Sequence, residues 1–334
     1  MRHRKLLSPI IALALLAACR PAEGPPLPER PRGLFPVRQN VLVGLIDQNG
    51  RVVVEPTFEF VGETEGDLIA ARVDGRWGYV DRHGQFTIEA EYTEAGNFVD
   101  DRAPVAFEGQ AGYIDPAGEP AVEIRFGAAR SFAEGLGAVR HRELWGWVDA
   151  HGDTVIQPRF AFTRNFSQGL ATAREDEDGL LGFVDRTGSW AIEPAFLEAY
   201  SFSEAVAAVQ TLDQTWGFVS ADGTLALGPS YYWAYPFSDG FAAVRVGARW
   251  GYIDHQGNQV VIPRFDGAEP FSDGLAAVQT DGLWGYVNAA DELVIPHRFA
   301  RAEQFSGGLA AVTEDGNAWG YIDSRGEWVW APTE

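Results

Sequence analysis

One glycine recurs through most of this chain at nearly constant spacing, and that spacing limits the possible fold more than any other feature. Successive copies are 34, 34, 34, 36, 35, 34, 34 and 35 residues apart. The copies are Gly44, Gly78, Gly112, Gly146, Gly182, Gly217, Gly251, Gly285 and Gly320. Self-similarity at such a period indicates a repeat architecture, in which each unit packs mainly against its neighbours.

Each unit contains three short segments rich in Val, Ile, Tyr, Phe and Trp, which is typical of β-strands. In one unit they are segment A (Leu275 to Gln279), segment B (Leu283 to Asn288) and segment C (Leu293 to Phe299). Asp281-Gly282 lies between A and B, and such a pair between apolar runs indicates a hairpin. An Asp-x-x-Gly turn follows segment B in most units, as at Asp149 to Gly152, and we expect its carboxylate to cap the turn. The chain is therefore predicted to be all-β.

A second pattern follows the B–C turn. An aromatic residue such as Phe160 stands eight residues after the turn glycine, and a second one such as Phe166 follows six residues later. Both are expected in the core. Proline usually precedes the first aromatic by two residues, as at Pro158, and we expect it to end segment C because it cannot donate to a strand ladder. The repeated glycine marks a place where another backbone or ring approaches closely.

The unit count and the chain ends decide between an open and a closed array. Segment B is apolar on both faces, so neighbouring units must cover both. Nine three-stranded units lie outside the usual propeller of about 4 to 8 four-stranded blades. The first unit starts with segment A at Leu34 and the last ends with segment C at Val329, so no shared blade is completed. We predict an open, twisted, solenoid-like array over residues 34–334, with a closed β-propeller as the alternative.

The first 18 residues have the pattern of a secretory signal peptide, with basic residues before the apolar run Leu6 to Leu16. That run is too short for a spanning helix, which needs about 20 residues. Leu16 to Cys19 resembles a bacterial lipobox, which implies cleavage before Cys19 and acylation of that residue. Residues 19–33 would then be an acylated cysteine and a proline-rich tether. We expect an exported protein in the cell envelope, on the periplasmic or surface face, attached to the membrane only by this lipid.

The charge balance limits the partners. The formal net charge is −21, so phosphate backbones and anionic lipid headgroups would repel the surface, and nucleic acid is not an expected partner. Cys19 is the only cysteine, which predicts a mature chain without disulfides.

The repeated sequence Trp-Gly-Tyr-Val/Ile-Asp, followed by Gly, Pro-x-Phe and Phe-Ser-Asp-Gly-Leu-Ala-Ala-Val, resembles the bacterial WG repeat family over residues 34–332. Val43, Ala111 and Leu181 replace the tryptophan in three units, and we interpret the ring as useful for packing. The resemblance implies an exported or surface protein with an interaction role, and it provides no catalytic residues. A weaker likeness to cell-wall-binding aromatic hairpin repeats supports glycan binding as an alternative.

No pattern in the chain indicates catalysis, a metal or a cofactor. His83, His151 and His255 stand in the B–C turns of separate units, His141 stands in an A–B turn, and His297 stands near the end of segment C. None of them has a second histidine or a cysteine at metal-ligand spacing. The turn aspartates recur at one register, which favours capping over catalysis. No phosphate loop, dinucleotide fingerprint or Gly-x-Ser-x-Gly motif is present. We predict a non-enzymatic protein that binds a protein partner in the envelope, with a glycan or cell-wall ligand as the alternative.

Two local departures from the repeat are candidate binding residues. Glu175, Asp176, Glu177 and Asp178 form the longest A–B turn, whose length variation predicts a tip in solvent. This tip is interpreted as a solvated acidic loop, with calcium binding as the alternative. Tyr232, Trp233 and Tyr235 are aromatics beyond the repeat pattern, which could pad a connection or stack on a sugar or peptide.

Overall fold

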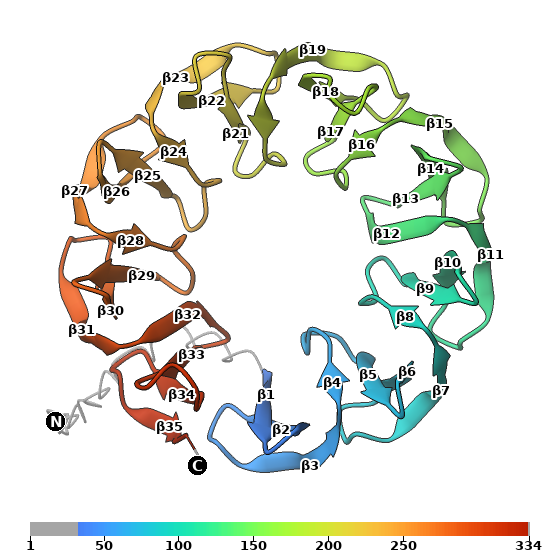
Figure 1. Ribbon diagram of the computed structural model, residues 1–334, viewed down its shortest axis with the longest axis horizontal. Coiled ribbons are helices and arrows are strands. Elements are labelled where there is room, and N and C mark those ends of the chain that lie inside the picture. Colours follow the sequence, from blue (N-terminus) through green and yellow to red (C-terminus); the bar gives the residue numbers. More distant parts are fainter. Residues whose placement is uncertain (1–32, 333–334) are drawn as a thin grey trace, which may run out of the picture. The chain divides into compact units, whose positions relative to one another are not determined.

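The computed structural model describes residues 33–332, which form nine antiparallel sheets arranged as blades around a central hole (Figure 1). The first blade has three strands, β1–β3, and each of the other eight has four. No helix occurs among the described residues. The prediction of an all-β repeat fold is confirmed. The prediction of an open array of three-stranded units is wrong, because the blades close into a ring.

The fourth strand comes from the segment between strand C and the next strand A, which the sequence pattern leaves as a connection. In blade 3 this segment contributes the two-residue strand β8 (Glu94–Ala95), which pairs with Ala106 and Val105. We call this the inner strand, since it lies nearer the hole, whereas strand C lies along the outer rim (Figure 1). The chain therefore leaves each blade at its rim and enters the next blade at its inner edge.

The four strand types recur in the same order in every complete blade. The inner strands are β4 (Phe60–Val61), β8, β12 (Ala128–Ala133), β16 (Phe162–Thr163), β20 (Glu198–Ala199), β24 (Trp233–Ala234), β28 (Gly267–Ala268) and β32 (Arg301–Ser306). The A strands are β1 (Leu34–Gln39), β5 (Ile69–Val73), β9 (Ala103–Phe107), β13 (Leu136–His141), β17 (Ala171–Arg174), β21 (Val206–Gln210), β25 (Ala242–Val246), β29 (Leu275–Thr280) and β33 (Leu309–Thr313).

The B and C strands complete the blades. The B strands are β2 (Leu42–Asp47), β6 (Arg76–Val80), β10 (Gln110–Ile114), β14 (Leu144–Asp149), β18 (Leu181–Val184), β22 (Trp216–Ser220), β26 (Arg249–Ile253), β30 (Leu283–Asn288) and β34 (Gly320–Asp323). The C strands are β3 (Val52–Phe58), β7 (Phe86–Tyr92), β11 (Pro120–Phe126), β15 (Thr154–Phe160), β19 (Trp190–Phe196), β23 (Leu225–Tyr231), β27 (Gln259–Phe265), β31 (Leu293–Phe299) and β35 (Trp328–Trp330).

The repeated glycine of strand B lies against an irregularity in strand C. Trp145 pairs with Phe160 and Trp147 with Ile156, so strand C carries extra residues between these two pairs. A Cβ atom on Gly146 would lie 2.4 Å from the carbonyl oxygen of Ile156, which explains why no side chain is tolerated there. Proline was expected to end strand C, and this is wrong: Pro158 lies in the bulge, where no ladder hydrogen bond is required, and β15 continues to Phe160.

The B–C turns are capped as expected. The Oδ1 atom of Asp149 accepts hydrogen bonds from the backbone N–H groups of His151 and Asp153 at 2.9 and 3.0 Å. Gly152 has a φ of +85°, a conformation that glycine adopts without strain. The hydrogen bonds to the carboxylate, that from His151 first, lower the pKa of Asp149. These aspartates therefore serve the turn.

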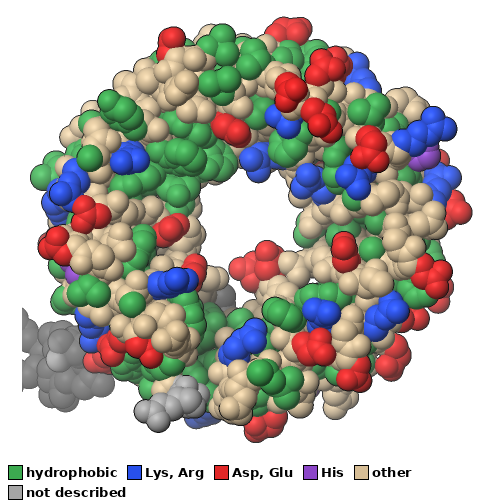
Figure 2. Space-filling view, viewed as in Figure 1, with side chains coloured by type: hydrophobic (Ala, Val, Ile, Leu, Met, Phe, Trp, Pro, Cys, Tyr) green, Lys and Arg blue, Asp and Glu red, His purple; other side chains and the backbone are tan. Residues whose placement is uncertain are grey.

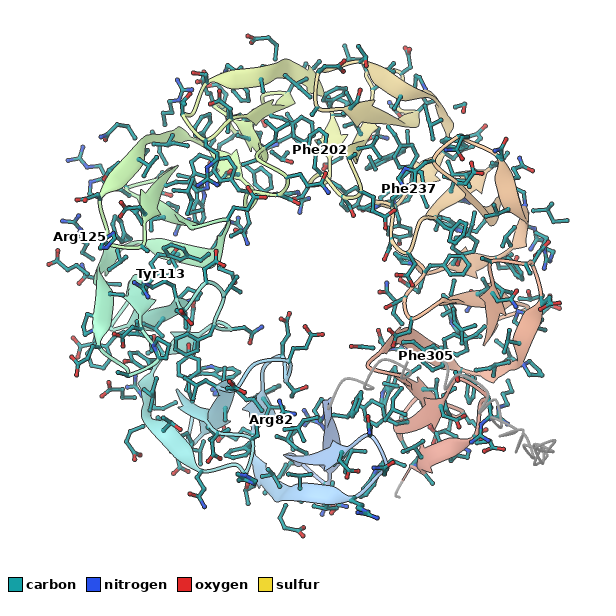
Figure 3. All side chains as sticks on the ribbon, turned by 180° about the vertical axis from the view of Figure 1, so that it is seen from behind. Arg82, Tyr113, Arg125, Phe202, Phe237 and Phe305 are labelled. Carbon is teal, nitrogen blue, oxygen red and sulfur yellow. The ribbon has the colours of Figure 1, made fainter. Side chains whose placement is uncertain are left out.

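Aromatic rings join neighbouring blades near the hole. In strand B of blade 3, Tyr113 meets Phe132 of blade 4 edge-to-face, with ring centroids 4.6 Å apart (Figure 3). The hydroxyl of Tyr113 donates to the backbone oxygens of Arg130 and Ala138 at 2.7 and 2.9 Å. Equivalent ring pairs join Phe202, Phe237 and Phe305 to the preceding blade. Each blade is thus fixed to the next by a buried ring and, in several blades, by a satisfied hydroxyl.

The last and first blades meet through the same kind of contact. The Tyr321 hydroxyl donates to the backbone oxygen of Pro36 at 2.9 Å, at the register where Tyr113 meets Ala138. Blade 1 has no inner strand among the described residues, and Phe35 supplies the missing ring, 5.5 Å from Tyr321. Most other blades have alanine or glycine at the position of Phe35. Closure therefore needs no shared blade, because a side chain replaces a strand.

Hydrogen bonds between loops line much of the hole. The loop between the inner strand and strand A points toward the hole in most blades (Figure 1). The Asp100 carboxylate accepts from the backbone N–H of Gly135 at 2.9 Å, and the Asp273 carboxylate from Gly308 at 2.8 Å. Four equivalent bonds link the blades between them. Around the hole, from blade 3 to blade 9, neighbouring blades are therefore joined by side-chain hydrogen bonds as well as by hydrophobic packing.

Candidate binding face

All A–B turns lie on one face of the ring, because every blade repeats the same strand order and direction. We call this the A–B face. Near it, the tryptophan of strand B pairs across the ladder with an arginine of strand A in several blades, for example Arg140 with Trp145 and Arg245 with Trp250. The groove between one blade and the next is consequently lined by rings and guanidinium groups.

Across blades 4 to 7 these side chains form a continuous arginine–aromatic band. Arg130 lies over Trp145, with the guanidinium carbon 4.5 Å from the ring centroid, and also 5.9 Å from Phe162. Arg164 lies 5.6 Å from the rings of both Phe162 and Tyr200. The band consists of Trp145, Arg130, Phe162, Arg164, Tyr200, Trp216, Trp233, Tyr235 and Trp250, with Arg140 and Arg174 beside it. It joins blades through cation–π and ring contacts.

The arginines of the band lack acidic partners. Among the described residues no carboxylate lies within 4.0 Å of the Arg130, Arg140, Arg164 or Arg174 guanidinium groups. Burial, and then the positive charges of Arg164 and Arg140, lower the pKa of Arg130. In a chain of net charge −21, this is an unbalanced positive cluster. Such a site favours an anionic ligand.

Two of the three predicted aromatic residues belong to the band. Trp233 lies 5.0 Å from Trp216 and is 39% exposed. Tyr235 stacks on Trp250 at 5.4 Å and is half-buried. Tyr232 lies beside them in the chain and is 69% exposed. Figure 2 shows hydrophobic side chains gathered over β21 to β25, and positively charged side chains beside them over β12 to β17. The structure thus joins Trp233 to Trp216 of the neighbouring blade. Tyr235 contacts Trp250 of its own blade and, at 6.5 Å, Tyr200 of the neighbouring blade.

The acidic turn lies next to the band in the chain. Glu175, Asp176, Glu177 and Asp178 are all exposed, and they follow directly on Arg174 at the end of β17. Glu175 pairs with Arg159 at 3.5 Å, whereas the other three form no ion pair within the described part of the chain. No group of side chains suited to hold a metal ion occurs in residues 33–332. The four acidic side chains of this turn are thus open to solvent.

Cys19, the predicted lipid attachment residue, lies outside the described residues. In the part of the chain that the structure describes, there is no helix of the length and hydrophobicity needed to cross a bilayer.

Two cavities lie where the repeated tryptophan is missing, and sequence reasoning did not find them. Ala111 lines a cavity of about 640 Å³ between blades 3 and 4, and Val43 lines one of about 680 Å³ near the junction of blades 9, 1 and 2. Leu181, the third replacement, is buried and packs against Phe162 and Phe183. The aligned repeats contain a signal for the first cavity, because Ala111 and other positions around the same groove all hold small residues. The absence of the tryptophan was interpreted only as a change that the packing tolerates, and the space left by several small residues together was not considered.

These features define the class of the protein as a nine-bladed β-propeller built from repeats, a typical scaffold for binding other proteins. The family is shown by a match to the WG containing repeat at residues 44–77, 77–110, 112–145, 145–177, 182–213, 216–249, 250–284 and 284–317. The chain belongs to this family of WG repeat proteins.

Among solved structures, the first match reported below supports the fold alone. A crystal structure described as the eukaryotic initiation factor has a TM-score of 0.65 and 12% identity, and the match covers 91% of this chain and 95% of that one. The computationally designed Ika8 protein has a TM-score of 0.48 and 14% identity, with 79% and 95% covered. BamB from Moraxella catarrhalis has a TM-score of 0.47 and 12% identity, with 75% and 88% covered. No protein with a curated functional description matches the chain.

Proposed function

We propose that this propeller is a non-catalytic scaffold that binds a protein partner in the cell envelope through its A–B face. The observation that carries the proposal is the arginine–aromatic band. Trp, Tyr and Arg are the residues most enriched among those that dominate the energy of protein interfaces. Here they form one connected band across four blades, in which Trp145 and Trp216 are buried. Trp233 of the band and the neighbouring Tyr232 are exposed to a partner.

The acidic turn adds negative charge beside the positive charge of the band. Glu175 to Asp178 carry exposed negative charge next to the arginines of the band. A partner with complementary charges would be oriented by both, and its affinity would fall as salt rises, because charges are screened beyond about 8–10 Å at physiological ionic strength. Specificity would therefore depend on the charged groups and affinity on the buried rings.

The anchoring part of the proposal rests on the signal sequence and Cys19. An acylated Cys19 followed by the proline-rich residues 20–33 would hold the ring beside a membrane without a spanning helix. Cys19→Ser should leave the ring folded and release it from membranes. The measurement is incorporation of radiolabelled fatty acid: a wild-type chain that takes up no label would contradict the lipid anchor.

Two variants test the binding surface. One replaces Tyr232, Trp233 and Tyr235 with alanine, and the other replaces Glu175 and Glu177 with Gln and Asp176 and Asp178 with Asn. Ile262→Ala serves as the control, since Ile262 is 56% exposed in β27, on the outer rim. We expect the aromatic variant to lose capture of an envelope protein by roughly tenfold or more, the acidic variant to lose mainly its salt dependence, and Ile262→Ala to be unchanged. Equal capture by all three would contradict the proposed surface.

A glycan or cell-wall ligand is the second candidate, because exposed rings such as Trp233 can stack on sugars. Titration with peptidoglycan fragments separates the two functions. Saturable binding that the aromatic variant loses, without any captured protein, would favour the glycan.

A further inference from the structure

The cavity between blades 3 and 4 exists because bulky side chains are missing together. Ala111 of β10 pairs with Ala106 of β9, at the register where blade 4 pairs Trp145 with Arg140. Across the groove, Ala128 of β12 occupies the position that Phe162 has in the next blade. Gly96 stands where blade 4 has Arg130. Four large side chains of the neighbouring groove are thus replaced by three alanines and a glycine, which leaves about 640 Å³ open.

One part of this cavity is strongly positive. Arg130 and Arg164 both line it, and no carboxylate among the described residues lies within 4.0 Å of either. The Nε atom of Arg130 and the Oδ1 atom of Asn165, which also lines the cavity, are buried and have no hydrogen-bond partner. Buried polar groups are normally satisfied, so these two atoms are exceptions in the fold. Of the described residues that line the cavity, Glu94 alone is acidic.

The grooves between other pairs of blades indicate which ligand shape would fit the cavity beside Ala111. In blade 4 the groove holds the indole of Trp145 against Arg130, at 4.5 Å from the guanidinium carbon. The cavity beside Ala111 has neither that ring nor an arginine at the Gly96 position, but Arg130 and Arg164 of the next two blades line it. Its volume falls within the range of small-ligand sites, about 300–1,000 Å³. A planar ring can enter, and a carboxylate next to it can reach the guanidinium groups, which suit carboxylates in bidentate geometry.

We propose that this cavity binds an aromatic side chain of a protein partner, inserted where the repeat's own tryptophan is missing, with an adjacent Asp or Glu of that partner paired to Arg130 and Arg164. The inference rests on the proposed function and names the chemistry that the A–B face recognises: an acidic segment containing an exposed aromatic residue. The incoming ring completes the series of rings, and the incoming carboxylate supplies the counter-charge that the band lacks.

Filling the cavity is the direct test. Ala111→Trp restores the residue that six other units carry, so the fold should tolerate it while the cavity closes. Val43→Trp is the matched control, because it makes the same restoration at the other cavity. The probe is a fluorescein-labelled peptide, Gly-Gly-Asp-Trp-Asp-Gly-Gly, measured by anisotropy. We expect saturable binding to the wild type, at least about tenfold weaker binding to Ala111→Trp, and unchanged binding to Val43→Trp.

Charge is tested separately. Arg164→Gln should weaken binding of the peptide by about tenfold and flatten its salt dependence, since a charge-assisted hydrogen bond is lost. Arg298→Gln is the control: Arg298 also lies over a phenylalanine, 4.7 Å from the Phe299 ring, but on the outer rim. A peptide with Lys in place of Asp, and one with Ala in place of Trp, should both bind the wild type at least about tenfold more weakly.

Three outcomes would overturn the inference. The first is no binding of the acidic tryptophan peptide to the wild type, and the second is binding that survives Ala111→Trp. The third is preference for an oligosaccharide of uronic acids, which has carboxylates without aromatic rings. The proposed function is judged apart from these, by capture of an envelope protein. Capture that the alanine variant of Tyr232, Trp233 and Tyr235 loses, but Ala111→Trp keeps, would leave the scaffold function standing and remove the cavity from it.

Discussion

Removing the ring of Phe35 should destabilise the propeller at its closing interface. Phe35 is 6% exposed and packs with Val37, Ile46 and Leu309, as well as with Tyr321. A buried Phe→Ala change typically costs about 3–5 kcal/mol in free energy of unfolding, because burial is lost and a void remains. The void cannot collapse easily here, since the Tyr321–Pro36 hydrogen bond holds the two blades at their present distance. We expect Phe35→Ala to fall within that range.

Two further variants make this prediction specific. Phe271→Ala removes the equivalent ring from a contact inside the chain, 4.8 Å from Tyr252, and should cost about as much. Phe107→Ala removes a ring that is 41% exposed and should cost less than about 1 kcal/mol.

The assay is urea unfolding followed by tryptophan fluorescence, with small-angle scattering to report the dimensions of the ring in native buffer. Phe35→Ala should lower the unfolding midpoint by as much as Phe271→Ala. If Phe35→Ala behaves like Phe107→Ala, the first and last blades do not close the ring in the way described. A wild-type scattering profile of an extended rod would refute the closure itself.

Two other predictions follow from the turns and the bulge. Gly146→Ala should destabilise the fold by about 1–3 kcal/mol or more, because its Cβ would lie 2.4 Å from the Ile156 carbonyl oxygen. Gly228→Ala is the control and should be tolerated, because no atom lies within 4 Å of the added Cβ. Equal unfolding midpoints of the two variants in urea would contradict the close packing at Gly146. The lowered pKa of Asp149 means that its charged form stabilises the folded state above the ordinary pKa of 3.8, and this contribution is lost as the pH falls through the still lower folded-state pKa. Asp149→Asn should keep the turn, because Asn288 caps the equivalent turn in blade 8 through the same backbone hydrogen bonds. The variant should show a weaker dependence of Tm on pH below about 5. An unchanged dependence would show that the Asp149 carboxylate contributes nothing to stability.

Much of the blade was predictable because its causes are local. Three features of the sequence depend on interactions between residues close together in the chain. They are the position of Gly285 and its equivalents in strand B, the aspartates that cap the B–C turns, and the alternation of side chains along each strand. The structure therefore reproduces β29, β30 and β31 at almost the expected bounds. The prediction that proline ends strand C was wrong because proline lies in a bulge, where no backbone N–H donor is needed. The bulge depends on how strand C pairs with strand B, which the local sequence does not show.

The candidate binding face was only partly predictable. Trp233 stood out as an additional aromatic residue, but nothing near it in the chain indicates that Trp216 lies 5.0 Å away. Arg130 and Arg164 are 34 positions apart in the sequence, and only the stacking of blades brings both to the cavity beside Ala111. The small residues that form this cavity come from different strands, so their combined effect is a property of the groove.

By itself the sequence determined the repeat, its phase, the strands and their turns, since these depend on interactions within one unit. Only the tertiary structure decided the fourth strand, the closure and the surfaces that closure creates. The physical reason is that closure depends on a small rotation between neighbouring blades, repeated around the ring and set by the volume of side chains between them. Phe35 shows this well: at its position most units have Ala or Gly, and its ring completes the interface only because Tyr321 returns to meet it.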